Sequence, residues 1–141
     1  MALCVNFSLI SFNVRGISNF KKRKTIFTWC RKQKADFLFL QETHSKKDSE
    51  TCWKNKWGSE VIIAHGSSNS RGVAMLFKKG VDYKIHSKIL DPLGRYITLK
   101  AEIEDKMYVL INICAPNKDT NIENFLNNLL MQTLMKKKTL L

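Results

Sequence analysis

The feature that most constrains the fold is a pair of short apolar runs, Val5–Val14 and Phe37–Leu40, on either side of a helical pattern. Ser18-Asn19 can cap a helix that continues to about Lys34, with apolar residues on one side and basic residues on the other. Strand, helix and strand in this order predict a βαβ unit with parallel strands. Because the first run is apolar on both faces, we expect it inside a sheet that is covered on both sides.

The chain changes character after Lys56, where short apolar or alternating runs are separated by turn residues. These runs are Val61–Ala64, Val73–Phe77, Tyr83–Ile89, Tyr96–Ile103 and Met107–Ile113. The pattern predicts an antiparallel meander of strands. Together with the βαβ unit, it indicates an α/β fold.

The last predicted element is an amphipathic helix. Thr120 and Glu123 have the spacing of a capping box at its start. Apolar residues then recur on one side of the helix: Ile122, Phe125, Leu126, Leu129 and Leu130. Because such a stripe needs a sheet to pack on, we predict one domain over residues 1–134, followed by a basic tail over residues 135–141.

Basic residues outnumber acidic ones, with 24 Lys and Arg against 12 Asp and Glu, and the formal net charge is +12. This excess favours polyanionic partners, nucleic acid first and an anionic membrane second. The run Lys21-Lys22-Arg23-Lys24 could follow a DNA backbone, and a solvated helix face explains it equally well. The same run resembles a short nuclear-import patch.

The cysteines Cys4, Cys30, Cys52 and Cys114 are widely spaced and form no C-x-x-C pair, which argues against zinc. The amino terminus lacks the pattern of a signal peptide, and no apolar run reaches the length of a membrane span. We therefore expect an intracellular, nuclear protein with free thiols. We expect DNA as its partner, with neither a membrane nor an obligate protein partner.

Asn13 and Glu42 are the first candidates for chemistry, because each comes at the carboxyl end of a predicted parallel strand. These ends lie side by side in an α/β unit, and ligands bind there. A carboxylate such as Glu42 can hold Mg²⁺, and the Asn13 amide can orient a phosphate oxygen or a water molecule. Two residues that simply cap strand ends would give the same spacing.

The segment 112–117, Asn-Ile-Cys-Ala-Pro-Asn, ends the last predicted strand. Pro116 stops the ladder and Asn117 begins a turn, which suits a phosphate-contacting loop or an ordinary strand exit. Other candidates are interpreted structurally. We expect Trp29, Trp53 and Trp57 to pack rather than stack on bases, and His44, His65 and His86 show no acidic partner in the sequence.

Three segments in order, 11–16 (Ser-Phe-Asn-Val-Arg-Gly), 36–44 (Asp-Phe-Leu-Phe-Leu-Gln-Glu-Thr-His) and 112–117, resemble the first three motifs of the endonuclease/exonuclease/phosphatase superfamily. The resemblance is greatest to the apurinic-type endonuclease of LINE-type (non-long-terminal-repeat) retrotransposons. It implies a four-layer α/β/β/α sandwich, here incomplete and limited to the amino-terminal half, that hydrolyses phosphodiesters in DNA. It also implies Mg²⁺, or Mn²⁺, bound by Glu42. Asn13, Glu42 and Asn117 would be catalytic, and Asn13, Arg15 and Asn117 would contact substrate.

The chain departs from the family pattern in two ways. Cys114 stands where the family usually has Tyr, and a thiol is too short to reach as a phenol does. The later Gly-Asp-x-Asn and Asp-His motifs of the family do not occur, so we expect this fragment to be inactive alone, since each lost group costs roughly 10²–10⁴ in rate. A non-catalytic nucleic-acid-binding remnant and a phosphatase of the same fold remain the alternatives.

Overall fold

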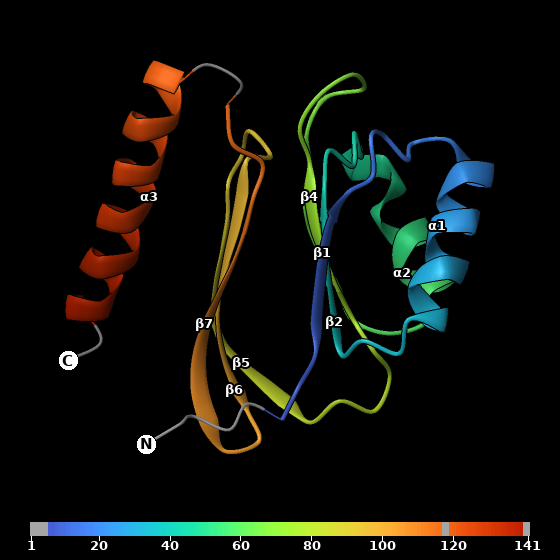
Figure 1. Ribbon diagram of the computed structural model, residues 1–141, viewed down its shortest axis with the longest axis horizontal. Helices are drawn as coiled ribbons and strands as arrows, with labels where there is room; N and C mark the ends of the chain where they lie inside the picture. The colour runs from blue at the N-terminus through green and yellow to red at the C-terminus, as the bar shows by residue number, and fades with distance from the viewer. Residues whose placement is uncertain (1–5, 117–118, 140–141) are drawn as a thin grey trace.

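The computed structural model describes residues 6–116 and 119–139, and in the last helix it describes side chains over 121–132. The elements in chain order are β1 (Leu9–Asn13), α1 (Phe20–Lys32), β2 (Phe37–Gln41), a 3₁₀ turn (Lys47–Ser49), α2 (Glu50–Trp57), β3 (Val61–Ala64), β4 (Val73–Phe77), β5 (Tyr83–Leu90), β6 (Tyr96–Ile103), β7 (Lys106–Ile113) and α3 (Asp119–Thr139). Figure 1 shows four layers: α1 with α2, a first sheet, a second sheet, and α3. This arrangement confirms the predicted α/β/β/α sandwich.

Sheet 1 has the strand order β1-β2-β4-β3. β1 and β2 are parallel, as predicted, with Asn13 opposite Gln41 at their carboxyl ends. β4 runs antiparallel to both β2 and β3, so the hairpin of β3 and β4 belongs to sheet 1. The predicted single meander is therefore wrong for these two strands. Every residue of both strands is buried, and a strand buried on both faces needs the covered position that sheet 1 offers.

β1 lies at the edge of sheet 1, and this corrects the expectation of a fully covered strand. Leu9, Ser11 and Asn13 are exposed, and the residues between them are half-buried. The strand is also shorter than predicted, because it begins at Leu9 within the described residues. β1 therefore brings Asn13 to an accessible end of the sheet.

α1 begins where the sequence predicts. The Asn19 side chain accepts hydrogen bonds from the backbone N–H groups of Lys21 and Lys22, at 2.9 and 3.2 Å. This satisfies two of the N–H groups that a helix start leaves unpaired. The helix buries Phe27 and Cys30 toward sheet 1, and its lysines are exposed, whereas Arg23 is buried.

α2 was not predicted from the sequence. It is eight residues long and ends at Trp57, and Gly58 follows as the C-cap with a left-handed φ of 82°. Trp53 and Trp57, one turn apart, are buried and meet the Phe27 ring edge-on at 5.5 and 5.6 Å. These two tryptophans pack in the core, as expected, whereas Trp29 is exposed beside Phe12.

Sheet 2 is the antiparallel meander β5-β6-β7, and here the prediction is confirmed. Its inner face packs on sheet 1 around buried residues such as Phe37, Phe77 and Leu99. Its outer face receives α3, where the Tyr96 ring lies 6.1 Å from that of Phe125.

α3 confirms the predicted final helix, and it extends to Thr139. Its apolar stripe is only partly covered: Leu129 is buried, but Leu126 and Leu130 are exposed. The proposed cap at Thr120 lies outside the residues whose side chains are described. The division into a domain over 1–134 and a tail over 135–141 stays a prediction, because the helix passes through that boundary.

Candidate active site

The candidate site lies at the carboxyl ends of β1 and β2. Backbone hydrogen bonds continue past the strands, from Gly16 N–H to Glu42 O (2.6 Å) and from Ile17 N–H to Thr43 O (2.9 Å). On the other side, the N–H groups of Thr43 and His44 donate to the carbonyls of Gly72 and Arg71, at 3.0 and 2.9 Å. Glu42 therefore stands in a loop that is fixed on both sides.

Gly72 shows how closely these loops approach. Its φ is +93°, and a Cβ at this position would overlap the Thr43 hydroxyl oxygen. Only glycine fits without a shift of the Glu42 loop.

Non-glycine residues with left-handed backbone gather around the site. Their φ values are 51° at Arg15, 55° at Glu42, 54° at His44 and 64° at Arg71. Such conformations cost of order 1–3 kcal/mol each and persist where the surroundings enforce them, which is common at functional sites. The hydrogen-bonded loops supply that enforcement here.

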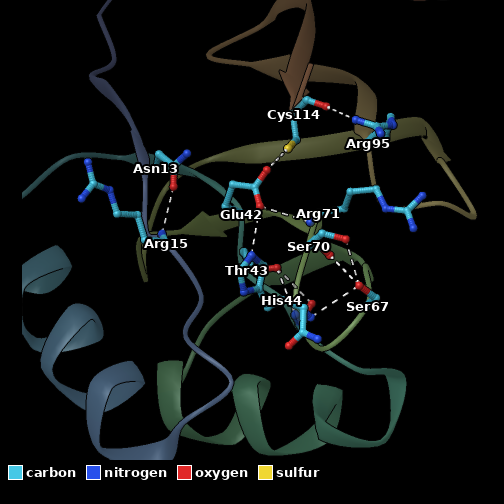
Figure 2. A network of polar contacts seen from close by, with 12 residues as sticks. Asn13, Arg15, Glu42, Thr43, His44, Ser67, Ser70, Arg71, Arg95 and Cys114 are labelled. Atoms are coloured by element: carbon cyan, nitrogen blue, oxygen red, sulfur yellow. Dashed lines mark hydrogen bonds and ion pairs between the residues drawn. The ribbon is translucent and has the colours of Figure 1, made fainter. Parts of the chain in front are cut away.

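The Glu42 carboxylate accepts three hydrogen bonds from different parts of the chain (Figure 2). The Cys114 thiol donates to Oε1 at 2.8 Å. On Oε2, His44 Nε2 lies at 2.9 Å and the Arg71 backbone N–H donates at 3.2 Å. The Glu42 side chain keeps 28% of its surface exposed, so the carboxylate is oriented yet accessible.

These contacts keep Glu42 ionised. Partial burial would raise its pKa, but the hydrogen bonds from Cys114, His44 and the Arg71 N–H, with the charge of His44, lower it below the ordinary value. The same contact has the opposite effect on the pKa of the Cys114 thiol. Burial, the hydrogen bond to Glu42 and the negative charge of Glu42 raise the pKa of Cys114 to about 11. At neutral pH the pair is therefore a carboxylate and a protonated thiol.

The carboxylate opens into a polar pocket of about 330 Å³ that is lined by Glu42, Ser70, Arg71, Arg95 and Ala115. Arg71 and Arg95 line the same pocket, although neither guanidinium forms an ion pair with the Glu42 carboxylate among the described residues. Guanidinium groups match the geometry of phosphate oxygens. The pocket thus combines a site for a hard cation with groups that attract a phosphate.

Arg95 was not found by the sequence reasoning. It follows a turn and precedes β6, and its guanidinium lies 3.5 Å from the carbonyl of Cys114. No local pattern marks it, because its neighbours in the pocket come from other strands.

The predicted site residues are only partly brought together. Asn13 reaches the same strand ends as Glu42, and its Oδ1 accepts a hydrogen bond from the Arg15 N–H at 2.9 Å. Arg15 is exposed, and in Figure 2 its side chain extends away from Glu42. Asn117 lies outside the described residues. The roles assigned to Asn13, Arg15 and Asn117 remain predictions.

The interpretation of the histidines as lacking acidic partners is wrong. His44 contacts Glu42 at 2.9 Å, His65 contacts Glu50 at 3.1 Å and His86 contacts Glu102 at 3.0 Å. Two of these pairs join residues that are 15 or 16 positions apart, and a search for adjacent acids misses them. The His44 pair, two residues apart, was visible within the motif itself.

Asn112 ties sheet 2 to sheet 1 directly below the site. Its buried amide donates to the carbonyls of Leu40 and Ala74, at 3.0 and 2.9 Å. Its Oδ1 accepts a hydrogen bond of 2.7 Å from Gln41 Nε2. This contact fixes the end of β7, and with it the position of Cys114, relative to Glu42.

The donor set suits one hard divalent cation rather than a metal cluster. Over the described residues, no group of three or more His, Cys, Asp or Glu side chains converges in a way that could hold a metal. Mg²⁺ is commonly held by one or two carboxylates, with water and substrate phosphate completing its shell. A carboxylate offers about four lone-pair positions, and three on Glu42 are used, so one remains for a cation.

Cys30, Cys52 and Cys114 are free thiols, as expected, while Cys4 lies outside the described residues. Among the helices in the described part of the chain, none is both long and apolar enough to cross a membrane.

Known proteins give matches to this arrangement. A family described as Endonuclease/Exonuclease/phosphatase matches residues 10–133. The Transposon TX1 uncharacterized 149 kDa protein of Xenopus laevis is 26% identical over 122 residues, which are 86% of this chain and 9% of that protein.

Two solved structures share the fold. An AP endonuclease from Archaeoglobus fulgidus has a TM-score of 0.54 and 24% identity, over 78% of this chain and 41% of that chain. The mannosyl-6-phosphatase Bt3783 of Bacteroides thetaiotaomicron has a TM-score of 0.66 and 12% identity, over 92% of this chain and 60% of that chain. At such identities the similarity shows the fold alone. This chain spans only part of the length of each of these relatives.

Proposed function

This chain belongs to the endonuclease/exonuclease/phosphatase family, and we propose that it hydrolyses phosphodiester bonds in DNA with the help of a divalent metal ion. The members of the family are hydrolases. The matched region covers residues 10–133 and includes Asn13 and Glu42. The similarity to a transposon protein supports DNA as the substrate, and a DNA substrate accords with the nuclear location that the basic run suggests.

One observation carries the proposal: the ionised Glu42 carboxylate, oriented by three hydrogen bonds, opens into a pocket beside Arg71 and Arg95. A carboxylate alone would repel a phosphate diester. A cation on Glu42, together with the two arginines that line the pocket, would reverse that repulsion. Stabilisation of the charge that develops in a transition state is commonly the largest contribution to catalysis.

Glu42 would hold Mg²⁺ or Mn²⁺, which when bound would polarise a phosphoryl oxygen and lower the pKa of a bound water. His44 and Cys114 would act through Glu42, since their contacts fix the two carboxylate oxygens. Asn13 would orient a phosphate oxygen or a water. Arg15 and Asn117 would contact substrate further out.

The test compares Glu42→Gln with Glu123→Gln, a matched loss of one carboxylate on the exposed face of α3. Mn²⁺ binding is followed by electron paramagnetic resonance, with and without duplex DNA, and nicking of supercoiled plasmid is assayed in Mg²⁺. We expect Glu42→Gln to weaken Mn²⁺ binding at least tenfold and to abolish any nicking. Glu123→Gln should resemble the wild type in both measurements.

The Mn²⁺ binding measurement tests the role of Glu42 even if the chain alone is inactive, because binding needs no turnover. Equal Mn²⁺ affinity in the wild type and Glu42→Gln would remove Glu42 as the ligand. Robust nicking that survives Glu42→Gln would remove it from the reaction.

A phosphatase of the same fold is the alternative supported by a specific observation, the structural similarity to a mannosyl-6-phosphatase. The two arginines could equally bind a phosphate monoester. Hydrolysis of p-nitrophenyl phosphate that depends on Glu42, without nicking of DNA, would favour this alternative. Salt-sensitive DNA affinity with neither metal binding nor hydrolysis would favour a non-catalytic nucleic-acid-binding remnant, which the net charge of +12 supports.

A further inference from the structure

A second basic pocket lies between α1 and the end of α2 and shares no residue with the Glu42 pocket. Its volume is about 170 Å³, nearly six times the ~30 Å³ that a water molecule occupies in the liquid. The residues that line it are Phe20, Arg23, Lys24, Phe27, Thr28, Arg31 and Lys56. Four of these side chains are cations and none is an acid.

Arg23 is a buried cation, and among the described residues no carboxylate forms an ion pair with it. It is 5% exposed, and its guanidinium donates to the carbonyls of Ile17 and Ser18, at 3.3 and 3.1 Å. It also lies 5.4 Å from the centre of the Trp53 ring. Carbonyl dipoles and an aromatic face compensate a buried charge only in part, so an anion in the pocket would be stabilised there.

The other cations are held at the pocket rather than paired with acids. Arg31 donates hydrogen bonds to the carbonyls of Lys56 and Trp57 and lies 5.2 Å from the Trp57 ring centre. Lys56 Nζ lies 5.3 Å from the centre of the exposed Phe20 ring. Over the described residues, no ion pair joins any of the four cations to an acid.

The surroundings favour a nucleic acid over a membrane as the source of the anion. Exposed lysines continue along α1 on both sides of the pocket, at Lys21, Lys22 and Lys32. A membrane-surface helix presents a broad apolar face, but α1 buries Phe27 and Cys30 in the core. A pocket lined by four cations, with further exposed lysines on the same helix, fits the phosphate backbone of a nucleic acid.

We propose that the pocket between α1 and α2 binds a backbone phosphate of a nucleic acid and anchors the strand away from Glu42. The inference rests on the proposed DNA substrate only for the choice of duplex DNA as the first probe. The guanidinium fork of Arg31 and the charge of Arg23 would contact the phosphate, and Lys24 and Lys56 would complete its neutralisation.

The test measures fluorescence anisotropy of a labelled 20-base-pair duplex in EDTA, so that hydrolysis plays no part. The pocket variant is Lys24→Ala with Lys56→Ala. Its matched control is Lys84→Ala with Lys88→Ala, two exposed lysines of β5 in sheet 2. Each removes two charges, and thermal denaturation checks that both variants are folded.

We expect the pocket variant to lose about tenfold or more in affinity, with the slope of log K against log salt reduced by about 0.9 for the loss of one phosphate contact. The control should lose less than about threefold. Equal losses of affinity in the two variants would overturn the site, because the positive charge would then act without regard to position. No loss of affinity in the pocket variant would overturn it as well. If the double variant is unstable, Lys24→Glu gives the same test, because this exposed side chain has no hydrogen bond or ion pair among the described residues.

Two further arms identify the source of the phosphate. Inorganic pyrophosphate that binds at the pocket without competing with DNA would overturn the nucleic-acid assignment. The assignment would also be overturned if the pocket variant lost binding to phosphatidylserine vesicles while its affinity for DNA stayed unchanged. The pocket variant should bind Mn²⁺ as tightly as the wild type in the absence of DNA, because Lys24 and Lys56 share no pocket with Glu42, so this measurement separates failure of this inference from failure of the proposed hydrolysis.

Discussion

Sheet 1 and sheet 2 differ in how completely they are covered. Every residue of β3 and β4 is buried, and in β2 only Gln41 is partly accessible. In sheet 2, β5 and β7 have mostly exposed or half-buried residues and only the central β6 is mostly buried, whereas in sheet 1 only the edge strand β1 is open. The helices differ in the same way: α1 and α2 bury Phe27 and Trp53, whereas α3 leaves Leu130 exposed.

The two sheets also contribute differently to the candidate site. Sheet 1 fixes the backbone of Glu42 through loops that belong to its own strands β1, β2 and β4. Sheet 2 supplies Cys114, which contacts the carboxylate, and Asn112, which holds that strand end in place. We infer that the location of the site depends on sheet 1 and that the orientation of its carboxylate depends on contact between the two sheets.

The largest effect should come from opening the core of sheet 1. Leu40→Ala removes a fully buried side chain beside α1 and α2, so we expect a loss of about 2–5 kcal/mol in the free energy of unfolding. Val109→Ala on sheet 2 truncates a side chain that is 52% exposed and should change stability by no more than about 0.5 kcal/mol. Urea denaturation followed by tryptophan fluorescence measures both. Similar losses for the two variants would contradict the contrast between the sheets.

A smaller effect should follow from cutting the tie between the sheets. Asn112→Ala leaves the carbonyls of Leu40 and Ala74 and the Gln41 amide without this partner, and we expect a loss of about 1–3 kcal/mol. The same urea titration measures it, with Asn128→Ala on the exposed side of α3 as the control. If Asn112→Ala is as stable as the control, the two sheets do not depend on this contact.

The smallest effect should be the pH dependence of the stability that Glu50 contributes. Partial burial would raise the pKa of Glu50, but the hydrogen bond from His65 and the contacts with Lys54 lower it below its ordinary value. A carboxyl with a lowered pKa stabilises the fold above its unfolded pKa of about 4.5, and the contribution is lost as pH falls through the lower, folded value. Glu50→Gln should therefore lower Tm slightly at pH 7 and hardly at all near pH 3. A Tm difference that grows on acidification would contradict this sign.

Local patterns were sufficient for the parts of the fold that depend on neighbouring residues. The Asn19 cap, the parallel pair β1 and β2, and the alternation of β6 follow from capping chemistry and from the period of apolar residues. The strand-end positions of Asn13 and Glu42 were predicted for the same reason. The family was identified from short motifs, and the match over residues 10–133 confirms it.

The amino-acid sequence alone thus determined the family, the strand ends where a site would form and the element types other than α2. Only the tertiary structure decided that β4 lies between β2 and β3, that Arg95 reaches the pocket, and that Cys114 donates to a carboxylate 72 residues away. The physical reason is the distance along the chain over which each kind of interaction acts. Helix caps and apolar periods act over a few residues, whereas strand order and side-chain contacts are selected by burial across the whole core, which no local pattern encodes.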